Sequence, residues 1–96
     1  MTLYELLESR RDEIRRIAAR HKANNVRVFG SVARNEAGPE SDIDLLVSFE
    51  EGASLLDHAA LIRELETALG CKVDVVSDRG LRDRIKERVL REAMPI

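Results

Sequence analysis

The sequence predicts a small mixed α/β (α+β) fold, in which helices flank a three-stranded sheet. Segments with the apolar spacing of a helix alternate along the chain with short runs rich in β-branched residues, which are typical of strands. The strands are expected at residues 26–29, 43–49 and 72–76. The 96 residues are too few for two domains of ordinary size, so we expect a single domain over residues 1–96. The pattern does not give the order of the strands.

Apolar spacing and helix caps predict the helices. Thr2 and Glu5 have the spacing of a capping box, and apolar residues recur at helical spacing after them, which predicts a helix over residues 3–22. Ser31 would lie near the N-cap of a short second helix. Residues 35–41 are expected to form the loop that follows it.

Two further helices are predicted in the second half of the chain. Ser54 would cap a helix over residues 55–69. Its apolar face would consist of Leu55, Ala59, Ile62, Leu65 and Leu69. Ser77 or Asp78 would cap the last helix, and Pro95 would fall just beyond its end. Its apolar positions would be Leu81, Ile85 and Val89.

Composition excludes several classes of protein. With 16 basic and 18 acidic residues the net charge is −2, which argues against a general nucleic-acid binder. No apolar run approaches the roughly 20 residues of a bilayer span, and the charged N-terminal segment does not resemble a signal peptide. One cysteine excludes an internal disulfide and a cysteine-rich zinc site. We therefore expect a cytoplasmic protein without membrane contact.

The first chemically informative segment is the turn where the first predicted strand meets a helix. Gly30 allows the backbone to approach a ligand closely, and the first amides of a helix point outward and attract anions. The Ser31 hydroxyl adds a donor, and Arg34 could reach a phosphate oxygen. The alternative is structural: a turn glycine, a helix cap and a solvated charge.

The second segment carries two aspartates at the start of a predicted strand. Asp42 and Asp44 project from one face, because side chains alternate along a strand. They repel each other unless a cation lies between them, and Mg²⁺ is typically held by one or two carboxylates together with substrate phosphates. Asp74 interrupts the next apolar strand and can join the pair if the two strands are neighbours. Three such carboxylates facing a phosphate-binding turn indicate metal-dependent phosphoryl or nucleotidyl transfer, the alternative being a solvated strand end.

These motifs resemble the DNA polymerase β-like nucleotidyltransferase superfamily. The resemblance comprises Gly30-Ser31, ten intervening residues, Asp42-Ile43-Asp44 and a third aspartate, Asp74, on a following strand. The chain is most similar to the minimal nucleotidyltransferases, the MntA-type antitoxins usually encoded beside a HEPN-domain toxin. Relatives often carry glycine at the place of Asn35 and arginine at the place of Gly38.

The resemblance implies a role for each site residue. Gly30 and Ser31 would hold the β- and γ-phosphates of ATP, with Arg34 beside them. Two Mg²⁺ ions would be bound by Asp42 and Asp44, and Asp74 would ligate the ion next to the acceptor. The activity implied is transfer of AMP to a hydroxyl, expected to be a tyrosine of the HEPN toxin, within a hetero-oligomer. A catalysis-independent antitoxin that binds the toxin directly is the alternative. Transfer to a small molecule is less favoured, because it typically needs a second domain.

Overall fold

The computed structural model describes residues 2–38, 41–81 and 83–96. In chain order the elements are α1 (Leu3–Ser9), α2 (Arg11–Arg20), β1 (Ala23–Phe29), α3 (Gly30–Ala33), β2 (Ile43–Phe49), α4 (Leu55–Leu69), β3 (Val73–Ser77), the 3₁₀ turn η1 (Asp78–Gly80), α5 (Asp83–Glu92) and β4 (Met94–Pro95). The predicted loop over residues 35–41 lies partly outside the described residues. None of the helices in the described part of the chain has the length and apolar composition that a membrane span requires.

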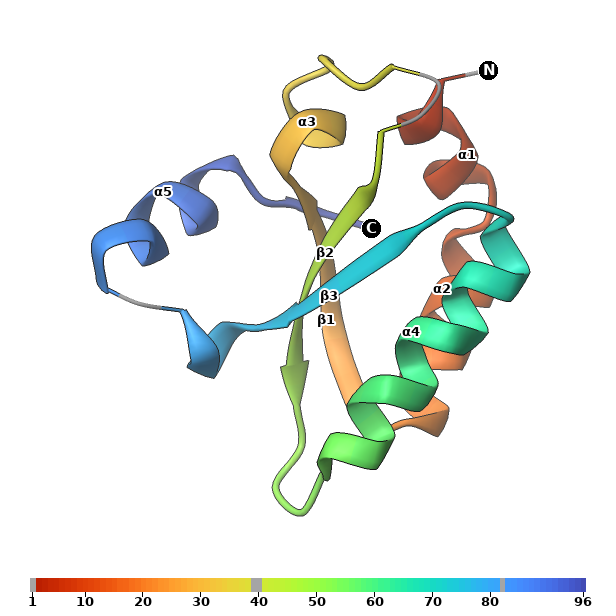
Figure 1. Ribbon diagram of the computed structural model, residues 1–96, viewed down its shortest axis with the longest axis vertical. Helices are drawn as coiled ribbons and strands as arrows, with labels where there is room; N and C mark the ends of the chain where they lie inside the picture. Colours follow the sequence, from red (N-terminus) through yellow and green to blue (C-terminus); the bar gives the residue numbers. More distant parts are fainter. Residues whose placement is uncertain (1, 39–40, 82) are drawn as a thin grey trace.

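The strands form one mixed sheet in the order β3-β2-β1-β4. Strand β1 pairs antiparallel with β2 and with β4, whereas β2 and β3 run parallel. Helices α2 and α4 cover one face of the sheet, and α5 lies on the other side (Figure 1). The mixed α/β prediction is therefore confirmed, although the sheet has a fourth strand.

Strand β2 is the centre of the packing and is buried on both faces. Ile43, Leu45 and Val47 belong to the large apolar cluster that also contains the buried side chains of α2 and α4. Leu46 points to the opposite face and is 0% exposed, although it lies outside that cluster. Helix α5 lies on the side of the sheet opposite to α2 and α4, and Val89 is its only buried residue among those described. The strand that carries Asp44 is therefore fixed from both sides.

The strand that the sequence did not predict is β4, at the C-terminal end of the chain. Only Pro95 after the last helix was expected there. Met94 pairs with Val28 of β1, and the Ile96 N–H donates to the Val26 carbonyl at 3.0 Å. Such a short strand depends on pairing with a distant segment, so no local pattern announces it. Pro95 is tolerated there because β4 lies at the edge of the sheet.

The predicted helix over residues 3–22 is two helices. The Thr2–Glu5 capping box is present, but the backbone leaves the helical conformation at Arg10, with φ −107° and ψ 14°. The Arg10 guanidinium donates to the Ala68 carbonyl at 2.8 Å, near the end of α4. The arginine that interrupts the apolar stripe thus marks a bend that lets the N-terminal segment follow α4.

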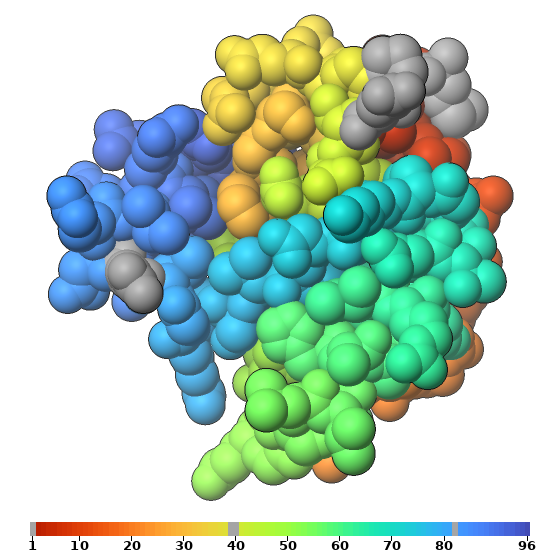
Figure 2. Space-filling view, in the orientation of Figure 1, coloured from red at the N-terminus to blue at the C-terminus, as the bar shows by residue number. Residues whose placement is uncertain are grey.

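The predicted apolar face of α4 is wrong in its first two turns, where Leu55 and Ala59 are exposed. The buried residues are Leu61, Leu65 and Leu69. Leu55 is 86% exposed and Leu56 is 81% exposed. The first turn of α4 adjoins the β2–α4 loop, which projects at the end of the molecule away from α3 (Figures 1 and 2). Helical spacing predicts which residues of α4 share a face. It does not predict how far along the helix the sheet covers that face.

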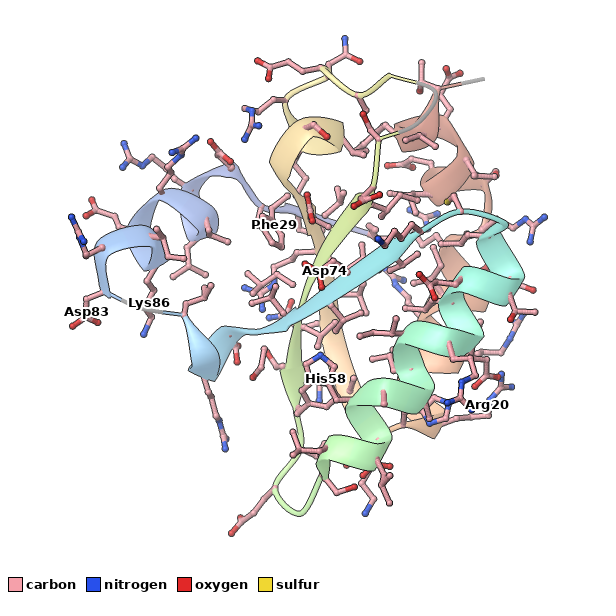
Figure 3. All side chains as sticks on the ribbon, viewed as in Figure 1. Arg20, Phe29, His58, Asp74, Asp83 and Lys86 are labelled. Carbon is pink, nitrogen blue, oxygen red and sulfur yellow. The ribbon has the colours of Figure 1, made fainter. Side chains whose placement is uncertain are left out.

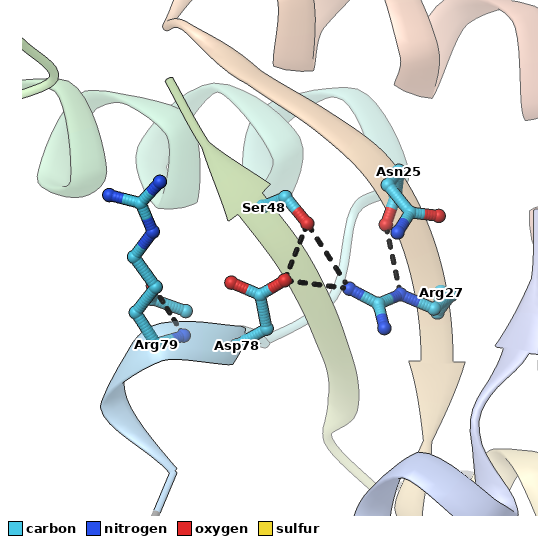
Figure 4. A network of polar contacts seen from close by, with 6 residues as sticks. Asn25, Arg27, Ser48, Asp78 and Arg79 are labelled. Carbon is cyan, nitrogen blue, oxygen red and sulfur yellow. Dashed lines mark hydrogen bonds and ion pairs between the residues drawn. The ribbon is translucent and has the colours of Figure 1, made fainter. Parts of the chain in front are cut away.

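The last helix begins later than predicted. The Ser77 hydroxyl accepts from the Arg79 N–H at 3.3 Å and caps η1, and α5 starts at Asp83. Asp78 accepts from the Ser48 hydroxyl at 2.6 Å and pairs with Arg27 at 3.5 Å (Figure 4). These contacts hold η1 against β1 and β2, and they thereby fix the position from which the chain continues to α5.

Candidate active site

Three polar and aromatic side chains form a row across the sheet near α3. Phe29 of β1 pairs with Asp44 of β2, and Asp44 pairs with Asp74 of β3. Directly paired residues point to the same face, so both carboxylates project from the face toward α5 (Figure 3). Asp42 lies just before β2 and is exposed. The parallel β2–β3 pairing, which the sequence left open, therefore brings the three predicted carboxylates to one end of the sheet.

The three carboxylates repel one another. Burial raises the pKa of Asp44 above its ordinary value, and the charges of Asp74 and Asp42 raise it further, while the Arg34 charge partly offsets them. No ion pair within residues 2–38, 41–81 and 83–96 involves any of the three aspartates. The protein thus concentrates negative charge there without a cationic side chain bonded to it.

This donor set fits Mg²⁺ that arrives with a nucleotide. Within the described residues no group of three or more His, Cys, Asp or Glu is arranged to hold a metal ion by itself. Mg²⁺ commonly takes one or two carboxylates and completes its shell with water and substrate phosphates. Asp44 and Asp74 on paired strands, with Asp42 two residues before Asp44, supply oxygen ligands of that kind.

Gly30 is required by the close approach of α3 to Asp44. Its φ is +72°, a left-handed conformation that side chains other than glycine rarely adopt. A Cβ at this position would overlap the Asp44 Oδ2 atom and lie 3.2 Å from Cγ. The glycine that the sequence predicted for a ligand's approach also makes room for a carboxylate of the site.

Ser31 lies near the N-cap of α3, as predicted, but it does not cap the helix itself. The N-cap position is Phe29, which makes no side-chain cap hydrogen bond, and Ser31 lies within the helix. Helix α3 has only four residues, so its dipole is small and phosphate binding would depend on individual groups such as the Ser31 hydroxyl. Asn35 ends this region at φ 59°, a left-handed conformation that asparagine tolerates and glycine adopts readily.

Arg34 is engaged by two carboxylates. Its Nε donates to Glu36 Oε2 and its Nη1 to Glu92 Oε2, each at 3.1 Å. The Glu36 hydrogen bond is the main cause that raises the pKa of Arg34. Arg34 is therefore not a solvated charge, because two ion pairs hold its guanidinium in place. Its contact with a phosphate oxygen stays a prediction. No local pattern pointed to Glu92, which lies 58 residues from Arg34 along the chain.

The aspartate end is open rather than enclosed. A pocket of about 410 Å³ lies between the start of α1 and the segment after α3, and Asp42, Asp44 and Asp74 are not among its lining residues. The first part of β2 reaches the surface between α3 and β3 (Figure 2). A bulky acceptor can approach such a surface.

We expect Gly30→Ala to destabilise the protein more than Gly70→Ala does. Both glycines have nearly the same φ, +72° and +70°, so both variants carry the same backbone strain of about 1–2 kcal/mol. Only Gly30 faces Asp44, whereas nothing lies within 4 Å of a Cβ at Gly70. Overpacking should add about 1–3 kcal/mol at Gly30 in urea unfolding. Equal losses would show that Asp44 does not crowd this turn.

We expect Asp44→Asn to raise the melting temperature of the metal-free protein at pH 7. A raised carboxyl pKa in the fold means that the charged form destabilises it, and this cost disappears as the pH falls below the ordinary value of 3.8. The substitution should therefore raise the melting temperature at pH 7 and raise it less at pH values near 3.8.

Melting in EDTA at pH 7 and pH 3.5 measures this difference, with Asp12→Asn on the exposed face of α2 as control. The difference in melting temperature between Asp44→Asn and the unsubstituted protein should be smaller at pH 3.5. A lower melting temperature for Asp44→Asn at pH 7 would contradict the repulsion.

Known proteins match the chain over most of its length. The nucleotidyltransferase domain family matches residues 11–94. A protein of Methanocaldococcus jannaschii, named provisionally as a protein adenylyltransferase, is 45% identical over 80 residues, which cover 83% of this chain and 86% of that protein. The protein adenylyltransferase MntA of Thermococcus cleftensis is 41% identical over 91 residues, covering 86% and 92% of the two chains.

Solved structures agree with these relatives. One described provisionally as a minimal nucleotidyltransferase has a TM-score of 0.89 and 57% identity, covering 100% of this chain and 97% of that chain. A toxin–antitoxin complex with AMP-PNP has a TM-score of 0.75, but its 22% identity, over 88% of this chain and 69% of that chain, supports the fold alone. The predicted fold and the resemblance to minimal nucleotidyltransferases are confirmed, and the chain belongs to the nucleotidyltransferase domain family.

Proposed function

We propose that this nucleotidyltransferase transfers AMP from ATP to a hydroxyl group of a partner protein in a Mg²⁺-dependent reaction. The observation that carries the proposal is the grouping of Asp42, Asp44 and Asp74 beside the Gly30 turn, through the pairing of β2 with β3. The names of the relatives from Methanocaldococcus jannaschii and Thermococcus cleftensis support a protein acceptor.

Each residue has a separate role in this reaction. Gly30 and Ser31 bind the β- and γ-phosphates, and Asp42 and Asp44 ligate the magnesium that travels with them. Asp74 would ligate the magnesium ion next to the acceptor and help to remove the proton of the acceptor hydroxyl. The acceptor oxygen attacks the α-phosphorus, an O–P bond forms, and the bond to pyrophosphate breaks. Bound Mg²⁺ neutralises charge on the attacking and leaving oxygens.

The acceptor is a protein rather than a small molecule. Asp42 and Asp74 are exposed, and the described pocket near α3 does not include them, so the chain offers little to hold a small acceptor. A protein acceptor positions its own hydroxyl through an interface. We propose a tyrosine of a HEPN-type toxin, in keeping with solved neighbours described as toxin–antitoxin complexes.

The modification would silence the toxin without continued binding. An AMP group adds a bulky nucleotide and a negative charge, which repels the phosphates of an RNA substrate. A cytoplasmic location, a single domain and a hetero-oligomer with the toxin stay predictions.

We expect coexpression with the toxin to make the toxin heavier by whole AMP units in intact-mass spectrometry. Asp44→Asn should reduce this transfer by about a hundredfold or more, the scale on which loss of one transition-state electrostatic contact acts. Asp74→Asn should lower the single-turnover rate more than ATP affinity, whereas Ser31→Ala should mainly weaken ATP binding.

Asp12→Asn is the matched control and should transfer AMP at the normal rate, because Asp12 is exposed on α2, which covers the face of the sheet opposite to α5. A toxin that stays unmodified, yet is neutralised by the Asp44→Asn chain, would refute transfer and establish inhibition by direct binding.

A further inference from the structure

Helix α5 leaves most of its surface exposed. Val89 is its only buried side chain. Its N-terminal side follows η1, which Asp78 fastens to β1 and β2 (Figure 4). Its C-terminal side leads into β4, where Met94 pairs with Val28, two residues before Gly30. The sheet therefore places the end of α5 beside the turn that begins α3.

Glu92 is the residue of α5 that makes contact at this point. Its Oε2 atom accepts from Arg34 Nη1 at 3.1 Å, and its Oε1 atom accepts from Arg88 Nε at 3.4 Å. The Glu92 side chain is 25% exposed, compared with 64% for Glu36, the other partner of Arg34. Glu36 lies in the segment after α3, whereas Glu92 is held by a helix and by the strand that follows it.

The two carboxylates leave one side of the Arg34 guanidinium available. Nε and Nη1 are bonded, and among the described residues no hydrogen bond from Nη2 is found. The Arg34 N–H donates to the Gly30 carbonyl at 3.1 Å, and Gly30 lies against Asp44, so Arg34 belongs to the segment beside the aspartate end of β2. An arginine with two nitrogens fixed presents the third in a defined direction, and guanidinium groups bind phosphate oxygens well.

We propose that Glu92 is a positioning residue for nucleotide binding: it holds the Arg34 guanidinium so that Nη2 meets a phosphate oxygen of ATP. This inference rests on the proposed function, since it needs ATP at the Gly30 turn. It makes α5 part of the nucleotide site without any contact between α5 and ATP. A partner that displaced α5 would therefore weaken ATP binding.

Two substitutions at Glu92 separate positioning from charge. Glu92→Ala removes the bond to Arg34, whereas Glu92→Gln keeps an oxygen acceptor and removes the negative charge. If Glu92 positions Arg34, Glu92→Ala should raise the Kd for Mg²⁺–ATP about two- to fivefold, the scale of one partly exposed ion pair, and Glu92→Gln should retain most of the affinity. If Glu92 competed with phosphate, both variants would bind ATP more tightly, and that result would overturn the proposal.

The decisive experiment is a double-mutant cycle with Arg34→Ala, measured by calorimetric titration of Mg²⁺–ATP without acceptor. We expect Glu92→Ala to have no further effect on the Kd once Arg34 is absent. An equal loss in both backgrounds would show a structural role and overturn the proposal. In transfer assays with the toxin, the KM for ATP should rise while kcat stays unchanged.

Glu87→Ala is the matched control on α5, because Glu87 is exposed and, among the described residues, pairs with Arg91 alone, at 3.9 Å. It should leave ATP affinity unchanged, and a loss equal to that of Glu92→Ala would overturn the proposal. Absence of ATP binding to the unsubstituted protein would refute the proposed function as well. If the unsubstituted protein binds Mg²⁺–ATP and Glu92→Ala binds it with the same Kd, this inference is refuted and the proposed function is not.

Discussion

The repulsion among neighbouring carboxylates is the constraint around which this small protein is built. Asp44 and Asp74 face the same way on paired parallel strands, and Asp42 lies two residues before Asp44. Negative charges in this arrangement destabilise a fold unless a cation joins them. Strand β2 cannot move to relieve this repulsion, because Ile43, Leu45 and Leu46 bury it on both faces.

The surrounding elements keep this charged end compact and open. Gly30 lets α3 lie against Asp44, where any Cβ would overlap the carboxylate. Helix α5 and β4 reach the same turn from the other end of the chain, through Glu92 and through the pairing of Met94 with Val28. The site is thus assembled from segments at both ends of the sequence. Asp74 is exposed, so an acceptor can approach it.

Local pattern was sufficient to predict three of the four strands and to single out the candidate site residues. Asp42 and Asp44 stand out because acids are unusual in strands, and Gly30 follows a β-branched run. The sequence could not show β4, the bend at Arg10 or the exposure of Leu55, because each depends on what a distant segment covers or bonds. Glu92 was missed for the same reason, since one glutamate among the charges of α5 has no distinguishing local feature.

The most direct measurement of the central claim is paramagnetic broadening by Mn²⁺ of the amide signals of the labelled protein, with AMP-PNP present. Manganese takes the oxygen ligands that suit magnesium and broadens signals of nearby nuclei. The account predicts selective broadening at Gly30, Ser31, Asp44 and Asp74, and its loss in Asp44→Asn. Signals of Leu55 and Leu56, at the opposite end, should stay sharp. Broadening centred on the acidic loop at Glu50 and Glu51, or unchanged in Asp44→Asn, would contradict it.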